Sequence, residues 1–210
     1  MRRKSILAAV AAVTLLMAFG FTSTDAKSAD WRLLATLEAS QSAPLHLRFD
    51  GAALPPMAYT TFCQSFSDEC RNRRLFRGGP VALTEARWTE LKEVNQHVNG
   101  AIIPESDEAD HSADSWLIDP KRGDCSDYAV SKRHRLLQAG WPARTLLLAE
   151  VVTVWGKHHL VLVVRTTSGD LVLDNLTAVI RPWSRAPYRW VRTQSPESAR
   201  YWQTVAKRGV

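Results

Sequence analysis

Two stretches of the chain carry apolar side chains at helical spacing. The first begins near Thr84, a residue suited to capping a helix, and stops at Asn99-Gly100. Its inward-facing positions are Trp88, Leu91, Val94 or Asn95, and Val98. The second covers residues 126–139 and ends at Gly140-Trp141-Pro142, where the glycine lacks a side chain and the proline lacks an amide donor. We therefore predict two helices, the second with Cys125 at its N-terminus.

Runs of valine and leucine follow the second predicted helix. Residues 145–155 and 160–165 have strand composition, residues 166–170 favour a turn, and residues 171–174 continue the apolar pattern. This order predicts a helix followed by an antiparallel meander. The segment after Ala178 combines tryptophans with prolines, which favours loops and a final turn around the sheet.

The N-terminus has the layout of a secretory signal peptide. Basic residues 2–4 precede an apolar run over residues 6–21, and small side chains occupy residues 22–26. The apolar run is short for a membrane span of about 20 residues, so we expect cleavage after Ala26, with an uncleaved anchor as the alternative. The mature protein is then periplasmic, with no stable insertion in the membrane.

The rest of the chain has room for one domain with a sizeable core. Residues 27–77 contain prolines, serines and threonines without clear periodicity, and we expect an irregular N-terminal arm there. Residues 78–210 are the expected catalytic domain. Removal of residues 1–26 leaves 24 basic and 20 acidic side chains, because it takes away three of the 27 Lys+Arg and one of the 21 Asp+Glu. A net charge of +4 with short, separated basic clusters does not favour nucleic-acid binding.

The chain has three cysteines, an odd number for an exported protein. Cys63 and Cys70 are close enough in sequence to bridge within one loop, as suits an oxidising compartment. Cys125 would then keep a thiol. Pairing of Cys125 with one of the other two is the alternative, and it would remove that thiol.

Cys125 has the surroundings of a nucleophile. A helix N-terminus favours the thiolate, because its unpaired amides and aligned peptide dipoles attract an anion. His159 opens an apolar strand and is a candidate base, while Asp174 is an acid at the end of another and can orient an imidazole. A turn centred on residues 166–167 places His159 opposite Asp174. A turn centred on residues 168–169 is chemically more natural but separates them by about 13 Å along the strand.

Several short motifs occur in one order along the chain. They are Phe62-Cys63, Cys70, Trp88, Val94-Asn95, Asp114-Ser115-Trp116, Gly123-Asp124-Cys125-Ser126-Asp127-Tyr128-Ala129, His159-Leu160-Val161-Leu162, Val172-Leu173-Asp174-Asn175, Trp183 and Tyr188. In these the sequence resembles the bacterial transglutaminase-like cysteine proteinases, which include the LapG-type periplasmic proteases. The resemblance spans nearly the whole mature chain. It implies an α+β fold of the papain-like and transglutaminase-like kind, and a proteolytic triad of Cys125, His159 and Asp174.

The resemblance also bears on cofactors and partners. LapG-type proteases cleave large surface adhesins and bind calcium through acids flanking the nucleophile. Asp124 is a candidate calcium ligand here, but Ser126 stands where that branch tends to carry an acid. We expect no required cofactor, with calcium as an option. A protein substrate is implied, and a regulatory partner in the inner membrane is a further option.

The expected reaction is attack of the Cys125 thiolate on an amide carbonyl after His159 has taken its proton. The Cys125 amide can donate to the oxyanion, and the indole of Trp116 or a loop amide can supply a second donor. The sequence thus predicts an exported cysteine endopeptidase. An acyltransferase or amidase using the same triad is the alternative among enzymes. A non-catalytic domain that binds a protein partner is the alternative from another class.

Overall fold

The computed structural model describes residues 45–71, 79–105 and 115–206, which belong to one compact unit. The predicted signal peptide and Asp114 lie outside the described residues. Three α-helices are described: α2 (Met57–Ser65), α3 (Glu85–Ala101) and α4 (Cys125–Gln138). The strands are β1 (Phe49–Ala53), β2 (Ile103–Pro104), β3 (Arg122–Gly123), β4 (Leu146–Val152), β5 (His158–Thr166), β6 (Gly169–Leu173), β7 (Arg181–Pro182), β8 (Arg189–Gln194) and β9 (Trp202–Val205).

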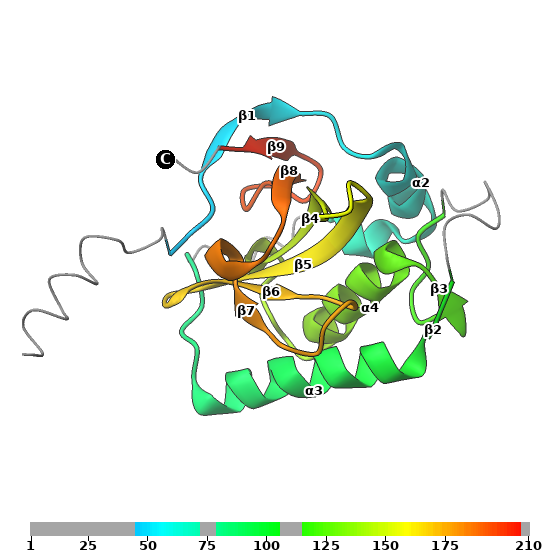
Figure 1. Ribbon diagram of the computed structural model, residues 1–210, viewed down its shortest axis with the longest axis horizontal. Helices are drawn as coiled ribbons and strands as arrows, with labels where there is room; N and C mark the ends of the chain where they lie inside the picture. Colours follow the sequence, from blue (N-terminus) through cyan, green and yellow to red (C-terminus); the bar gives the residue numbers. More distant parts are fainter. Residues whose placement is uncertain (1–44, 72–78, 106–114, 207–210) are drawn as a thin grey trace, which may run out of the picture. The chain divides into compact units, whose positions relative to one another are not determined.

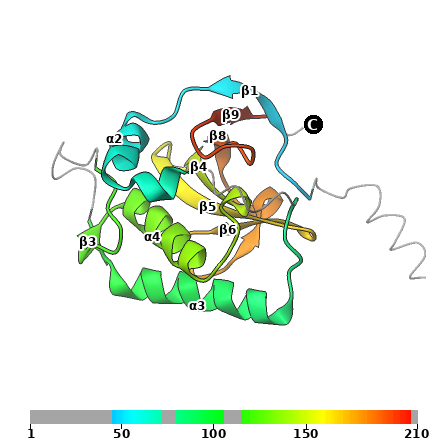
Figure 2. The same cartoon turned by 180° about the vertical axis from the view of Figure 1, so that it is seen from behind.

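Seven of these strands form one antiparallel sheet in the order β1-β9-β8-β4-β5-β6-β7. Helix α4 packs on β5, and α3 packs on α4, so that α4 lies between α3 and the sheet (Figures 1 and 2). The predicted α+β fold is therefore confirmed. Among the described residues, no helix has the length and apolar character needed to cross a membrane.

The two predicted helices form where their sequence signals place them. The Thr84 side chain accepts a hydrogen bond from the Arg87 amide at 3.3 Å and caps α3. Helix α4 ends before Gly140, which has a φ of 87° that favours a residue without a side chain. The meander of β4, β5 and β6 is also present as predicted.

Two other predicted regions differ from the structure. The expected irregular arm contains β1 and α2, and α2 buries Ala58, Tyr59 and Phe62 at helical spacing. The expected C-terminal loops contain β8 and β9, and β8 pairs directly with β4. The missed strands have one cause: short strands with prolines nearby carry little local signal and are held by pairing with distant partners.

Strand β5 separates two cores. Its even-numbered residues Leu160, Leu162 and Val164 pack in the core that includes the apolar residues of α4. Its odd-numbered residues Val161 and Val163 pack on the opposite face with Trp183. Because successive side chains of a strand point to opposite faces, the neighbours His158 and His159 belong to different sides of the sheet.

Candidate active site

Cys125 is the first residue of α4, and two reciprocal caps, from Asp124 and Asp127, fix the start of this helix. The Asp124 side chain accepts hydrogen bonds from the amides of Ser126 at 2.8 Å and Asp127 at 3.2 Å. In return, Asp127 Oδ2 accepts from the Asp124 amide at 3.1 Å, which completes a capping box. Burial raises the pKa of Asp127 to about 6. The cap leaves Cys125 at the positive end of the helix dipole.

Gly123 allows this cap to close. A Cβ atom at residue 123 would lie 2.3 Å from Asp127 Oδ2 and 2.9 Å from Asp127 Cβ. Any side chain there would therefore displace the carboxylate that holds the Asp124 amide. The Gly123-Asp124-Cys125 motif is thus a local device that places the thiol at the helix N-terminus.

The sulfur of Cys125 contacts β5 at a part of the strand that β6 does not pair with. The Leu160 amide donates a hydrogen bond to Cys125 Sγ over 3.4 Å. Pairing between β5 and β6 begins only at Leu162, opposite Leu173. The first residues of β5 therefore have no β6 partner, and the N-terminus of α4 reaches this part of the strand. Donation from an amide adds to the helix dipole in favouring the thiolate.

His159 and Asp174 are brought together, through a register that differs from both predicted ones. Thr166 pairs with Gly169, so the turn is centred on residues 167–168 and Asp174 comes two positions from direct opposition to His159. Diagonal neighbours of this kind are within reach of long side chains. His159 Nε2 donates to Asp174 Oδ1 at 2.9 Å, and the two side chains are 5% and 3% exposed. The separation of about 13 Å expected from the more natural turn is thus wrong.

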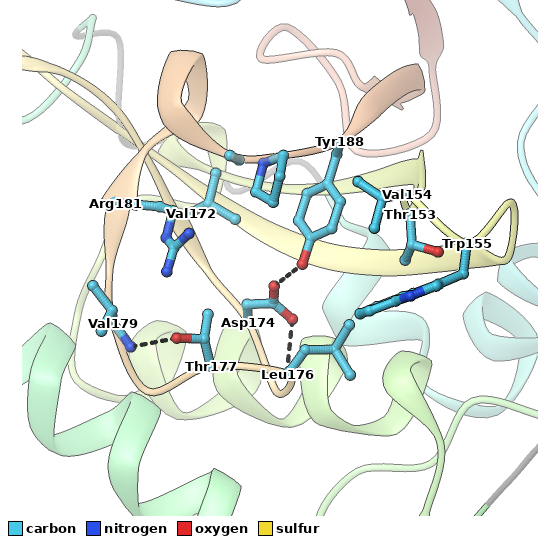
Figure 3. Close-up of a pocket in the computed structure, with 12 residues that line it drawn as sticks. Thr153, Val154, Trp155, Val172, Asp174, Leu176, Thr177, Val179, Arg181 and Tyr188 are labelled. Atoms are coloured by element: carbon cyan, nitrogen blue, oxygen red, sulfur yellow. Dashed lines mark hydrogen bonds between the residues drawn. The ribbon is translucent and has the colours of Figure 1, made fainter.

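Asp174 is held from two further directions. Its Oδ1 accepts from the Leu176 amide at 3.0 Å, and its Oδ2 accepts from the hydroxyl of Tyr188 (Figure 3). Burial alone would raise the pKa of Asp174, but the hydrogen bonds from His159, Tyr188 and Leu176 outweigh it and hold the pKa below its ordinary value. Burial and the bond to Asp174 raise the pKa of Tyr188. Asp174 is therefore a fixed, ionised acceptor for His159.

The His159–Asp174 pair stands between two pockets. One is open, with both polar and apolar residues in its lining, and both Cys125 and His159 line it. Its lining is Pro56, Met57, Ala58, Trp116, Asp124, Cys125, Ser126, Glu150, His158, His159, Leu160 and Arg192. The other is an apolar cavity of about 170 Å³ that has Asp174 and Tyr188 in its wall (Figure 3). Cys125 and His159 line the first of these two pockets and do not line the second.

Trp116 lines the pocket of Cys125 as a largely buried side chain. Its ring packs against those of Tyr59 and Phe62, with centroid distances of 5.7 and 6.0 Å. Helix α2 therefore fixes one wall of the pocket. Asp124, the residue directly before Cys125, also lines this pocket.

A buried cation lies on the α4 side of Asp174. Lys132 is 1% exposed, and its ammonium has no hydrogen-bond partner among the described residues. Burial lowers the pKa of Lys132 to about 7, and the charge of Asp174 partly offsets that shift.

The Asn99 amide donates to the Asp174 carbonyl at 2.9 Å, and that of Asn95 donates to the Ala178 carbonyl at 3.2 Å. Helix α3 thus anchors the segment that carries Asp174.

Cys63 and Cys70 form a disulfide, and Cys125 is outside it, as the odd number of cysteines predicted. The bridge joins α2 to the short 3₁₀ helix of residues 67–70. Glu69 of that turn accepts hydrogen bonds from Arg133 at 2.9 Å and is paired with His134 at 2.7 Å. The disulfide loop is thereby tied to α4, the helix that carries Cys125.

Three side chains of the site were not identified from the sequence. Glu150 and Arg192 line the pocket of Cys125, and Tyr188 holds Asp174. Glu150 had the same signal as Asp174, since each is an acid in or beside an apolar strand. Arg192 had none, because it lies in a segment that was expected to form loops. Tyr188 was noted only as part of the family resemblance, without a role in the site.

The described residues do not assemble a recognisable metal site. No three His, Cys, Asp or Glu side chains of residues 45–71, 79–105 and 115–206 cluster as metal ligands would. Calcium takes six to eight oxygen ligands. The amides of Leu117 and Asp124 donate to the two oxygens of Asp127, and the cap occupies one oxygen of Asp124. The described residues therefore do not by themselves fit calcium.

Comparisons with known proteins find similar solved structures, among them chains of LapG from Legionella pneumophila. The calcium-bound form is 19% identical, covering 85% of this chain and 90% of that one, with a TM-score of 0.51. The EGTA-treated form is 26% identical, covering 55% of this chain and 66% of that one, with a TM-score of 0.48. The calcium-bound form shares the fold. No curated protein matches.

Residues 49–209 match the family of bacterial transglutaminase-like cysteine proteinases. The match includes Cys125 at the N-terminus of α4 and both members of the His159–Asp174 pair. It also includes strands β1, β8 and β9, so it covers the sheet described above. The chain belongs to the bacterial transglutaminase-like cysteine proteinases, and its enzyme class is that of a cysteine protease acting on protein.

Proposed function

We propose that this protein is an exported cysteine endopeptidase that cleaves a protein of the periplasm or cell surface. Cys125 is the nucleophile, His159 the base and Asp174 the group that orients the base. The observation that carries the proposal is the hydrogen bond from His159 Nε2 to Asp174 Oδ1 beside a pocket that contains Cys125. The basic and apolar N-terminus supports export.

The hydrogen bond supports Nδ1 as the nitrogen of His159 that takes the proton. Because Nε2 donates to Asp174, the neutral ring carries its lone pair on Nδ1. Nδ1 takes the proton of Cys125 Sγ, and the thiolate attacks the carbonyl carbon of a peptide bond. The Cys125 amide donates to the developing oxyanion, and the indole of Trp116 is the proposed second donor. His159 then gives its proton to the leaving amine, and a thioester remains on Cys125.

Alkylation by iodoacetamide tests whether His159 activates Cys125. An ordinary thiol has a pKa of about 8.5. Cys125 of the mature protein should react with iodoacetamide at pH values well below that pKa. His159→Ala should return the reaction to the pH range of an ordinary thiol. His97→Ala is the matched control, because His97 is an exposed histidine of α3 outside the pocket. Equal pH profiles for the wild type and His159→Ala would refute the proposed base.

Substrate and location need a separate experiment. Exported proteins are compared between cells that contain the wild type and cells that contain Cys125→Ala, by sequencing new protein N-termini. We expect new termini in the periplasmic or surface fraction that require Cys125. The purified mature protein should begin at Lys27, as cleavage after Ala26 predicts. An intact N-terminus on the exported protein would contradict the cleaved signal peptide.

Calcium binding by Asp124 is a secondary proposal. Its support is the calcium-bound form of LapG, and no step of the proposed mechanism uses the ion. Calcium added to the EGTA-treated protein should raise the unfolding temperature if the ion binds the folded chain. Asp124→Asn should reduce that rise, and an unchanged rise would place the ion elsewhere.

A further inference from the structure

Lys132 is a cation on the inner face of α4, the helix that lies between α3 and the sheet (Figure 1). It comes seven residues after Cys125, so the two side chains point to the same face of α4, about 10 Å apart along the helix axis. Leu136 shares that face and packs in one core cluster with Leu173. Asp174 directly follows Leu173, and its charge acts on Lys132. The ammonium therefore faces the part of the sheet that carries the triad.

Within the part of the chain that the structure describes, this ammonium is buried without a hydrogen-bond partner. The Lys132 side chain is 1% exposed, and Nζ lies 5.8 Å from the ring centroid of Tyr128, a weak attraction. Burial of a charge without hydrogen bonds costs stability, and an apolar side chain of similar length would avoid that cost. Residues that break this rule are concentrated at functional sites. A role in the triad would explain the position of Lys132.

Three buried acceptors without a partner among the described residues belong to the surroundings of Asp174. They are the side-chain oxygens of Asn95, Asn99 and Asn175. The Asn99 nitrogen bonds the Asp174 carbonyl, Asn175 follows Asp174 in the chain, and Asn95 lies one turn before Asn99 on the same face of α3. Internal water ordinarily joins buried groups of this kind. The segment of Asp174 is thus rich in acceptors, the groups that stabilise a cation.

We propose that Lys132 is a positioning residue whose buried ammonium favours the two anions of the site, the Asp174 carboxylate and the Cys125 thiolate. The inference rests on the proposed function, since it assumes that Cys125 reacts as a thiolate. A positive charge stabilises the ionised form of a nearby acid and so lowers its pKa. Lys132 does not line the pocket of Cys125, so it acts through its charge and takes part in no proton transfer.

The other charged and titratable groups on this side of the site come from several elements. Tyr128 of α4 and Tyr188 both have a pKa raised by burial, so they stay neutral. Arg181 of β7, whose charge acts on Tyr188, stays charged at every pH of interest. His159 of β5 is bonded to Asp174, and α3 contributes the neutral asparagine amides. None of the two tyrosines and the arginine can therefore imitate a change in the charge of the buried ammonium.

The charge of Lys132 is present on one side of neutral pH. Burial lowers its pKa to about 7, so the ammonium is charged below that pH and neutral above it. Removing the charge raises the pKa of a nearby acid, and an acid with a raised pKa loses its proton at a higher pH. Loss of Lys132 should therefore move the acid limb of Cys125 reactivity to higher pH and leave the alkaline region unchanged.

Alkylation of the full mature protein by iodoacetamide from pH 4 to 9 tests this expectation. Lys132→Met removes a charge about 10 Å from the thiol, so the acid limb should move up by about 0.5 to 1 pH unit. At pH 9 the rate should stay within about twofold of wild type, because Lys132 is then neutral in both proteins. Lys132→Gln should give the same shift, since it also lacks the charge. Lys92→Met, on an exposed position of α3, should give none.

Urea unfolding first establishes that each variant is folded. An acid limb that stays in place in Lys132→Met and Lys132→Gln would overturn the proposal. So would a rate that falls by the same factor at every pH, because such a loss would come from packing. A shift in only one of the two variants would assign the effect to side-chain shape and would also overturn it. A wild type whose Cys125 reacts as an ordinary thiol would contradict the proposed function instead.

Discussion

The adjacent residues His158 and His159 are both held by a carboxylate, yet their environments are opposite. The His159–Asp174 pair is enclosed, and its carboxylate accepts three hydrogen bonds from the chain. The His158–Glu150 pair has an exposed imidazole on a largely buried acid. Charges interact more strongly where water is excluded, while exposed pairs are screened. The same chemical groups therefore give a strongly coupled pair on one face of β5 and a weakly coupled pair on the other.

Replacing each carboxylate by its amide should separate the two pairs most widely. Asp174→Asn removes the charge that fixes the His159 tautomer, and an amide nitrogen facing Nε2 would force the wrong one. We expect acetylation of Cys125 by p-nitrophenyl acetate to fall about a thousandfold. Glu150→Gln should change the same rate by less than about tenfold. Similar losses for both variants would show that the two pairs are equivalent.

The sequence could predict the members of the buried pair but not their contact. His159 and Asp174 stand out as polar residues beside apolar strands, and Cys125 stands out at a helix start. The register depends on a turn centred on residues 167–168, whereas the two predicted turns were centred on residues 166–167 and 168–169. Tyr188 belongs to the family resemblance, but its bond to Asp174 could not be predicted, because its segment is positioned by the sheet and not by local preference. Glu150 was visible by the same rule as Asp174, but no resemblance directed attention to it.

A buried cation on the α4 side of Asp174 further distinguishes the buried pair. Lys132 has a pKa of about 7 in the folded protein against an ordinary 10.5, so the unfolded chain binds more protons between these values. Stability should therefore rise as the pH rises from about 7 to about 10. Lys132→Met should be more stable than wild type by a few kcal/mol at pH 7 and should lose this slope.

Urea unfolding of the wild type and Lys132→Met at pH 7, 8.5 and 10 checks this expectation. The advantage of the variant should shrink as the pH rises, because the wild-type amine then becomes neutral in the folded state without cost. Lys92→Met is the matched control, since Lys92 is an exposed lysine of α3. A variant that is less stable than wild type at pH 7 would mean that Lys132 is a net stabilising partner of Asp174.

Tyr188→Phe should weaken the buried pair by a smaller amount. It leaves Asp174 Oδ2 without its hydroxyl donor, a loss of about 1–3 kcal/mol for a buried acceptor. The Tyr188 bond also helps to lower the pKa of Asp174. Stability from a carboxylate with a lowered pKa is present above its unfolded pKa of about 3.9 and is lost as the pH falls through the folded value.

The destabilisation of Tyr188→Phe should therefore be largest near neutral pH and should shrink below pH about 4. Unfolding by urea at pH 7, 5 and 3 gives the three values needed. Tyr201→Phe is a suitable control, because Tyr201 is exposed and outside both pockets. A destabilisation that stays constant over this pH range would assign it to packing of the ring alone.

The exposed pair should contribute least to stability, and this expectation completes the comparison. His158→Gln should change the free energy of unfolding by less than about 1 kcal/mol, because exposed ionic contacts rarely exceed that value. Any effect should diminish from 0.05 to 0.5 M salt, over which the Debye length falls several-fold. Urea unfolding at both salt concentrations measures it. A loss of several kcal/mol would make His158 a structural residue. A small loss would show that β5 presents one imidazole held rigidly by the fold and one held only weakly at its surface.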